Sequence, residues 1–239
     1  MPVYVITGAN RGLGLEFVRQ IAQDKSNTII ATTRSSSSDL SDLKSVSSSS
    51  THTLECDTGS VDSIKSFVSE ASKVLEGKKI DYLINNAGIN SAPDQTSLSL
   101  GLEDLYEQMR VNVVGPAKTT EFFLEAGLFA PKARIVNMTS GLASMKVGLS
   151  ITPRKCAGYS ISKSGVNMLT VQQSGDVREK LPEVVIICMD PGWVKTRMGG
   201  EGAVLEPHES IGGMLKAIHG LKEGDNGKFY TYTGEEVPW

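Results

Sequence analysis

Short runs of β-branched and apolar residues alternate along this chain with longer stretches in which apolar residues recur at helical spacing. The candidate strands are Val3–Thr7, Thr28–Thr33, Thr53–Glu55, Ile80–Ile84, Arg134–Met138, Val184–Cys188 and Lys228–Tyr232. The candidate helices are Leu13–Gln23, Val61–Leu75, Leu102–Phe129 and Tyr159–Lys180. Because the strand candidates are continuously apolar, they suit a parallel sheet that is buried on both faces. The alternation predicts right-handed βαβ units and a doubly wound α/β fold, with helices on both faces of a seven-stranded, mostly parallel sheet.

No internal repeat and no interdomain linker divides the 239 residues, so we expect a single domain over residues 1–239. One low-complexity stretch, Ser35–Ser50, contains ten serines among sixteen residues. It lies between the second and third candidate strands. A crossover with one short helix around Asp39–Val46 is therefore favoured over a flexible linker.

The composition argues against several classes of protein. Hydrophobic residues make up 39% of the chain and charged residues 21%, as in ordinary soluble globular proteins. The net charge of -3 comes from mixed signs without long blocks, so we expect no nucleic-acid partner and no membrane surface. The run Val3–Thr7 is far too short to span a bilayer, and no basic start or cleavage site precedes it. These features predict a cytoplasmic protein.

The number and spacing of the cysteines also favour a cytoplasmic location. Cys56, Cys156 and Cys188 are odd in number and widely spaced. They form neither a metal-ligand pattern nor a disulfide framework, so we expect a reducing compartment and no metal site.

A glycine-rich loop follows the first candidate strand and opens the first helix. Residues 7–14 have the sequence TGANRGLG. Glycines let the backbone turn tightly and approach phosphate oxygens, and a helix N-terminus supplies free N–H donors for a pyrophosphate. Alone, the motif is also compatible with a plain turn, but a strand before it and a helix after it favour a Rossmann-type nucleotide site. The residues expected to bind the cofactor in this loop are Gly8, Asn10, Arg11, Gly12, Leu13 and Gly14.

The end of the second candidate strand indicates which dinucleotide is bound. NAD-specific folds usually place a carboxylate there for the ribose 2′-OH. This strand instead ends Ala31-Thr32-Thr33-Arg34, without an acid. Arg34 can stack on adenine and pair with a 2′-phosphate, and Arg11 supplies a second positive charge. The sequence therefore favours NADP(H), although two solvated surface arginines remain the alternative.

Tyr159 and Lys163 are four residues apart, and hence lie on one face of the predicted helix. A phenol titrates near pH ~10 and is a poor acid–base group at neutral pH. A nearby ammonium, reinforced by an oxidised nicotinamide, stabilises the phenolate and lowers the pKa of the tyrosine. This spacing also occurs by chance on many helices, so its meaning depends on the nucleotide loop upstream.

Taken together, the motifs resemble the short-chain dehydrogenase/reductase family, in the family's order and over the whole chain. They are TGANRGLG, Asn85-Asn86-Ala87-Gly88 after the fourth strand, YSISK at 159–163 and PGWVKT at 191–196. The longer run PGWVKTRMGG looks like the carbonyl-reductase-like branch of that family.

The resemblance implies a role for each matching residue. Asp57 would bind the adenine amino group, and Asn86, Ala87 and Gly88 would border the cofactor. The nicotinamide would be held by Pro191, Gly192, Val194 and Thr196. Ser140 would hydrogen-bond the substrate oxygen, and Asn112 would hold a water in a proton relay.

Two of these assignments compete with other interpretations. Thr139 is a second hydroxyl beside Ser140, and Asn112 is also compatible with a structural role in a helix bend. The interval from Ser140 to Tyr159 is 159 − 140 = 19 positions, a few more than is usual in the family. We expect the extra residues, around Leu149–Cys156, to loop out.

The implied reaction is NADPH-dependent reduction of an aldehyde or ketone to an alcohol, with Tyr159 as general acid. Ser140 would bind the carbonyl oxygen, and Lys163 would hold the nicotinamide ribose. An alcohol dehydrogenase working in the oxidative direction and a non-catalytic NADP(H)-sensing protein remain alternatives. An epimerase or dehydratase with tightly held NAD is disfavoured, because the second strand lacks a terminal acid.

Two further expectations concern the surroundings of the site. Residues 197–207 would form a short lid before a helix near Glu209–Gly220, with Trp193 and Met198 either lining the pocket or packing beneath the loop. The resemblance also implies a homodimer or larger homo-oligomer that pairs through helices Leu102–Phe129 and Tyr159–Lys180.

Overall fold

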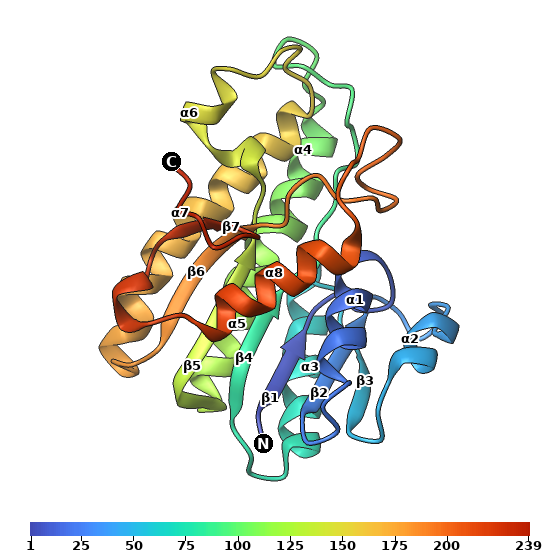
Figure 1. The fold of residues 1–239 in the computed structure, drawn as a ribbon, viewed down its shortest axis with the longest axis vertical. Helices are drawn as coiled ribbons and strands as arrows, with labels where there is room; N and C mark the ends of the chain where they lie inside the picture. Colours follow the sequence, from blue (N-terminus) through green and yellow to red (C-terminus); the bar gives the residue numbers. More distant parts are fainter.

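All seven predicted strands form, and they lie in one sheet in the order β3-β2-β1-β4-β5-β6-β7 (Figure 1). The computed structural model describes residues 1–239. The strands are β1 (Val3–Ile6), β2 (Thr28–Thr33), β3 (Thr51–Glu55), β4 (Ile80–Asn85), β5 (Phe129–Met138), β6 (Val185–Asp190) and β7 (Phe229–Thr231). Every pair of neighbouring strands is parallel. The strand order reverses between β1 and β4, and open α/β sheets bind ligands at the carboxyl ends of the strands at such a point.

Helices cover both faces of the sheet, as expected for βαβ units (Figure 1). The long ones are α1 (Gly12–Ile21), α3 (Val61–Leu75), α4 (Leu102–Met109), α5 (Gly115–Glu125), α7 (Ala157–Lys180) and α8 (Pro207–His219). One apolar core of 21 buried residues lies between the sheet and α1 and α8. A second core, of 19 buried residues, lies on the opposite face beneath α3 and α5. Phe17 fills the first core, and the edge-to-face pair of Phe67 and Phe123 fills the second.

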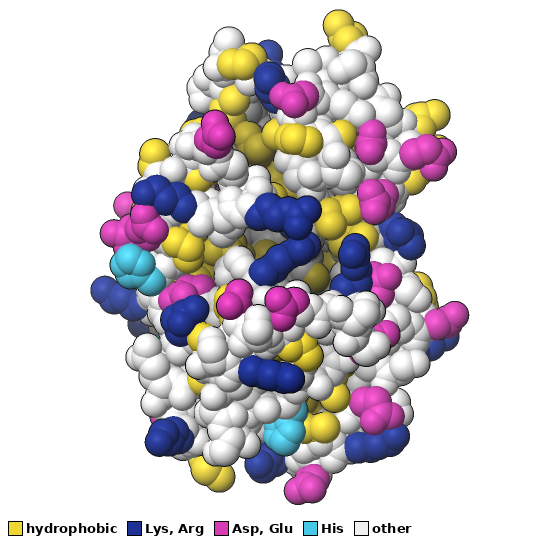
Figure 2. Space-filling model, turned by 90° about the vertical axis from the view of Figure 1, so that its right-hand side faces the viewer, with side chains coloured by type: hydrophobic (Ala, Val, Ile, Leu, Met, Phe, Trp, Pro, Cys, Tyr) yellow, Lys and Arg dark blue, Asp and Glu magenta, His cyan; other side chains and the backbone are white.

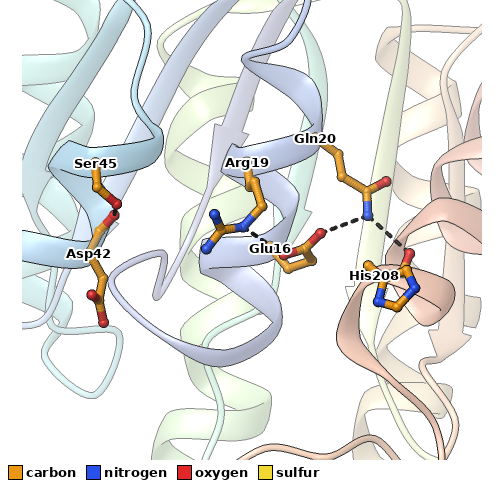
Figure 3. Close-up of polar contacts among 6 residues, drawn as sticks. All are labelled: Glu16, Arg19, Gln20, Asp42, Ser45 and His208. Carbon is orange, nitrogen blue, oxygen red and sulfur yellow. Dashed lines mark hydrogen bonds and ion pairs between the residues drawn. The ribbon is translucent and has the colours of Figure 1, made fainter.

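A side-chain hydrogen bond from Gln20 joins α1 to α8, and two more within α1 hold Gln20 and Arg19 against Glu16 (Figure 3). The Gln20 amide donates to Glu16 Oε1 at 2.9 Å and to the backbone oxygen of His208 at 3.0 Å. Arg19 Nε donates to the other oxygen of Glu16, at 3.0 Å. The bond from Gln20 to His208 therefore holds the start of α8, which follows directly on the expected lid.

The serine-rich crossover contains the expected short helix, α2 (Ser41–Val46). Leu43 is fully buried against the first core. Serine hydroxyls bond to the helix backbone: Ser45 Oγ donates to the oxygen of Asp42 (Figure 3), and Ser47 Oγ donates to that of Leu43. The serine side chains therefore form local hydrogen bonds that order this segment, which is not a flexible linker.

The prediction of a single helix over Leu102–Phe129 is wrong in two respects. It is interrupted by a π-helical turn, η1 (Arg110–Val114), and it ends at Glu125. Gly127 has φ +62° and turns the chain, after which Phe129 opens β5 and pairs with Ile80. The apolar residues at 128–129 continue the helical spacing, but they belong to the core beneath the sheet.

Candidate active site

The glycine loop has the shape of a phosphate-binding turn. Gly8 and Gly12 have φ of +67° and +57°, a region that favours glycine. Gly14 is buried, and a Cβ there would collide with the backbone oxygen of Gly8 and lie 2.6 Å from the amide nitrogen of Asn86. The N–H groups of Gly12, Leu13 and Gly14 have no acceptor within the protein, and no side chain caps the helix. This cradle fits the pyrophosphate of a dinucleotide.

The end of β4 fastens the glycine loop in place. Asn86 Nδ2 donates to the backbone oxygens of Thr7 at 2.8 Å and Gly8 at 3.1 Å. The N–H of Ala87 donates to Thr7 Oγ1 at 3.0 Å, and the N–H of Gly8 donates to Thr32 Oγ1 at 3.1 Å. The Asn86 amide therefore shapes the loop from behind.

The residues expected to recognise the adenosine end lie at the surface beside this loop. Arg11 and Arg34 are both exposed, and neither takes part in an ion pair. Figure 2 shows Lys and Arg side chains across the hollowed middle of this side of the molecule. Asp57 Oδ1 accepts from the N–H of Gly59 at 2.9 Å, which fixes the turn after β3.

One acid that the sequence reasoning missed lies near this end of the site. Glu55, the last residue of β3, accepts the N–H of Ser36 at 2.7 Å and so holds the segment that follows Arg34. The parallel register of β2 and β3 sets Glu55 opposite Thr33.

Tyr159 and Lys163 lie on α7, with Lys163 Nζ 5.6 Å from the centre of the Tyr159 ring. The lysine is buried, and its ammonium donates to the backbone oxygen of Met138 at 2.8 Å. Burial lowers the pKa of Lys163 to about 8. The helix therefore brings the predicted pair together at the end of β5.

The pKa of Tyr159 shifts in the direction opposite to that expected. Burial raises it, the negative charge of Asp190 and then Cys156 raise it further, and a hydrogen bond from Ser140 opposes the increase. Desolvation of the phenolate therefore outweighs the nearby ammonium in the free protein. Asp190 directly precedes the PGWVKT motif and belongs to none of the sequence motifs, so the motifs did not indicate this charge.

The structure separates the two competing hydroxyls after β5. Thr139 is buried, and its Oγ1 donates toward Asn167 Oδ1 at 2.7 Å and the backbone oxygen of Lys163 at 3.2 Å. Ser140 is half-buried, its Oγ accepts the N–H of Leu142 at 3.2 Å, and its hydroxyl lies near enough to Tyr159 to lower the pKa of the phenol. Only the Ser140 hydroxyl faces the tyrosine.

Asn112 lies in the π-helical turn and is buried. Its side chain forms a pair of hydrogen bonds with the backbone of Ile89, at 2.8 and 2.9 Å, and also donates to Ser162 Oγ at 2.9 Å. A Cβ at Gly88 would lie 3.2 Å from Asn112 Oδ1 and 3.3 Å from Lys163 Nζ. The glycine thus lets the end of β4 lie close to both side chains.

The turn after β6 returns toward the glycine loop. Gly192 has φ +78°, and the backbone oxygen of Pro191 accepts a hydrogen bond from Ser210 on α8. Val194 forms a bridge to Leu205, and the Thr196 methyl group lies 3.9 Å from where a Cβ of Gly12 would be. Segments after β1 and β6 therefore meet at one edge of the sheet.

The indole of Trp193 organises the segment 197–207. Its Nε1 donates to the oxygen of Gly199 at 2.8 Å, and Gly202 packs against the ring. Trp193 is 59% exposed and Met198 is 51% exposed. Trp193 thus packs against this segment and still presents a surface to solvent.

The extra residues between Ser140 and Tyr159 loop out, as expected. The residues around Leu149–Cys156 form a loop that follows the short helix α6 (Met145–Gly148) and contacts the segment after β4. Lys155 pairs with Asp94 at 2.8 Å, and the N–H of Cys156 donates to the oxygen of Pro93 at 3.0 Å. The loop is therefore held against the segment after β4, and Ser140 stays near Tyr159.

Comparison with known proteins gives the same family as the motifs. A model of the short chain dehydrogenase family matches residues 2–203. The C-signal protein of Myxococcus xanthus is 35% identical over 173 residues, which cover 71% of this chain and 98% of that protein.

Two solved structures match the whole chain. The NADPH-bound carbonyl reductase from chicken fatty liver has a TM-score of 0.88 at 32% identity, with 100% of both chains covered. The carbonyl reductase Sniffer of D. melanogaster has a TM-score of 0.88 at 29% identity, again with 100% of both chains covered. The resemblance deduced from the motifs is confirmed, and the chain belongs to the short chain dehydrogenase family of oxidoreductases.

Proposed function

We propose that this protein is an NADPH-dependent carbonyl reductase that converts aldehydes or ketones to alcohols. The observation that carries the proposal is the buried ammonium of Lys163, 5.6 Å from the centre of the Tyr159 ring, with the Ser140 hydroxyl near enough to lower the pKa of the tyrosine. Two hydroxyl groups at one point can both bind a carbonyl oxygen. The NADPH-bound chicken enzyme, similar over its full length, supports the same reaction.

The cofactor would lie along the carboxyl edge of the sheet. The free N–H groups of Gly12, Leu13 and Gly14, with Gly8 and Asn10 in the same loop, would hold the pyrophosphate. Asp57 would bind the adenine end. Pro191, Gly192, Val194 and Thr196 would hold the nicotinamide carboxamide, beside Ala87 and Gly88. When bound, NADPH supplies the hydride that reduces the carbonyl carbon.

Residues of the chain stabilise the negative charge that develops on the substrate carbonyl oxygen and then protonate that oxygen. Ser140 and Tyr159 donate hydrogen bonds to the carbonyl oxygen, where negative charge develops. Tyr159 then transfers its proton to that oxygen, which becomes the alcohol. Lys163 binds the ribose and stabilises the tyrosinate that remains. Asn112 borders the route by which a solvent proton returns to the tyrosine.

The substrate pocket is expected to accept apolar carbonyl compounds beneath a short lid formed by residues 197–207. The neighbouring segments expose large apolar side chains: Met145, Leu149, Trp193, Met198 and Val204. A panel of aldehydes, diketones and quinones, followed by loss of NADPH absorbance, tests the function. Absence of turnover across the panel, with NADPH bound, would favour the sensing alternative.

The preference for NADPH should depend on two arginines. Arg34→Asp, combined with Arg11→Ala, is expected to weaken NADPH binding by about tenfold or more, because each charge-assisted pairing contributes ~1.5–3 kcal/mol. Relative use of NADH should rise, since a carboxylate can accept the ribose 2′-OH. Binding of both cofactors by fluorescence titration measures the change. Equal preference before and after the substitutions would contradict the assignment of Arg34.

We propose that the protein forms a homodimer through α4 and α7, which pack together and expose apolar side chains. Leu102 and Tyr106 on α4 are 63% and 61% exposed, and Met168 on α7 is 59% exposed. Tyr106→Glu with Met168→Lys should therefore shift the mass measured by light scattering toward the monomer. Lys216→Glu, on α8, is the control. A monomeric wild-type protein at micromolar concentration would contradict the proposal.

A cytoplasmic location fits the three free thiols, Cys56, Cys156 and Cys188. None of the helices has the length and apolar character that crossing a membrane requires.

A further inference from the structure

We propose that Asp190 is a positioning residue of this active site. Its carboxylate holds the turn after β6 and lies against the turn that carries Ser140, and its unpaired negative charge at this point makes the site favour carbonyl reduction over alcohol oxidation. The inference rests on the function proposed above.

The geometry places one carboxylate between two functional turns. Asp190 is the last residue of β6, and its Oδ1 accepts the N–H of Gly192 at 3.1 Å. The backbone N–H of Gly141, the residue after Ser140, lies near enough to this carboxylate to lower its pKa. A Cβ at Gly141 would lie 3.1 Å from Asp190 Oδ2, so the turn lies directly against the acid. Movement of Asp190 would therefore displace both the Ser140 turn and the Gly192 turn.

The charge of Asp190 has no cationic partner. The protein contains seven ion pairs, and Asp190 takes part in none of them. Its side chain is half-buried, and burial raises the pKa of the carboxyl group. The backbone N–H groups of Gly192 and Gly141 oppose this increase, because they stabilise the carboxylate. Because Asp190 forms no ion pair, a contribution to stability through an ion pair does not explain an acid at this position. An electrostatic effect on the neighbouring active-site groups explains it better.

The groups facing Tyr159 come from three elements. Lys163 and Cys156 belong to α7 and its N-terminus, Ser140 follows β5, and Asp190 ends β6. After burial, Asp190 is the largest cause of the raised pKa of Tyr159. The Lys163 ammonium donates a hydrogen bond to the backbone oxygen of Met138. Removing the charge of Asp190 should therefore make the tyrosine lose its proton more easily.

Asp190→Asn tests the inference, because it removes the charge and keeps the size of the side chain. Carbonyl reduction requires protonated Tyr159 and falls as pH rises, whereas oxidation of the product alcohol with NADP⁺ requires the tyrosinate and rises with pH. In the variant, the fall of the reduction rate and the rise of the oxidation rate should both occur at a pH lower by about one unit. Asp176→Asn, an equal change of charge at an exposed position of α7, should leave both pH dependences unchanged.

Thermal unfolding without cofactor provides a readout that needs no turnover. A carboxyl group whose folded-state pKa is raised favours folding when protonated, so its contribution to stability is lost as the pH rises above the ordinary value of 3.8. Asn does not titrate. The melting temperature of Asp190→Asn relative to wild type should therefore increase as the pH rises from the acid range to neutrality.

The outcomes separate the two proposals. Wild-type protein that reduces no carbonyl compound overturns the proposed function, and the unfolding experiment still measures the ionisation of Asp190. An active wild type whose pH profiles coincide with those of Asp190→Asn overturns the inference alone. So does a variant that loses activity equally at every pH, because a purely structural role predicts that result.

Discussion

Replacing Tyr159 by Phe is expected to lower the rate of carbonyl reduction by about two to four powers of ten, the usual contribution of a positioned proton donor. The substitution removes only the hydroxyl, and the ring still packs beside Lys163. Burial and Asp190 keep the phenol protonated in the free protein, which suits a general acid. NADPH affinity, measured by fluorescence titration, should change little.

The control removes a neighbouring hydroxyl from the same helix. Ser160→Ala should retain wild-type turnover, because the Ser160 hydroxyl bonds to no residue of the site. Ser140→Ala should approach the effect of Tyr159→Phe, since Ser140 is the second donor to the substrate oxygen. Near-normal reduction by Tyr159→Phe would refute the proposed mechanism even though the family assignment stands.

Much of the architecture follows from local sequence. Continuous apolar runs located the strands, and β2 (Thr28–Thr33) and α3 (Val61–Leu75) begin and end where the pattern predicts. The glycine loop was recognisable because its backbone must approach phosphate, which constrains residue type at fixed positions. These features depend on burial and on backbone sterics, and both leave a signature in a single sequence.

Other features depend on contacts between distant segments. Phe129 has the spacing of the preceding helix, yet its pairing with Ile80 makes it the first residue of β5. The π-helical turn at Asn112 is held by hydrogen bonds to Ile89, which lies in another segment. The pKa of Tyr159 depends on Asp190 as well as on Lys163 four residues away. Local spacing contains no information about these partners, so the sequence did not indicate that burial and Asp190 raise the pKa of Tyr159 in the protein without cofactor.

Gly14→Ala is expected to lower NADPH affinity by on the order of ten- to a hundredfold and to destabilise the fold. A Cβ at this position meets the backbone oxygen of Gly8 and the amide of Asn86, neither of which is a flexible end that can move aside. Asn86 also donates to that oxygen, so relief of the clash must open the loop that presents the N–H groups of α1. Overpacking of this kind costs about 1–3 kcal/mol.

Gly175→Ala is the matched control for this substitution. Gly175 lies in α7, and no atom lies within 4 Å of the point that its Cβ would occupy. Alanine should therefore raise the free energy of unfolding by about 0.5–1 kcal/mol through its higher helix propensity. Chemical denaturation and NADPH titration of both variants give the comparison. If Gly14→Ala binds NADPH as tightly as Gly175→Ala does, the pyrophosphate does not lie against this turn. The cofactor would then have to be placed elsewhere along the edge of the sheet.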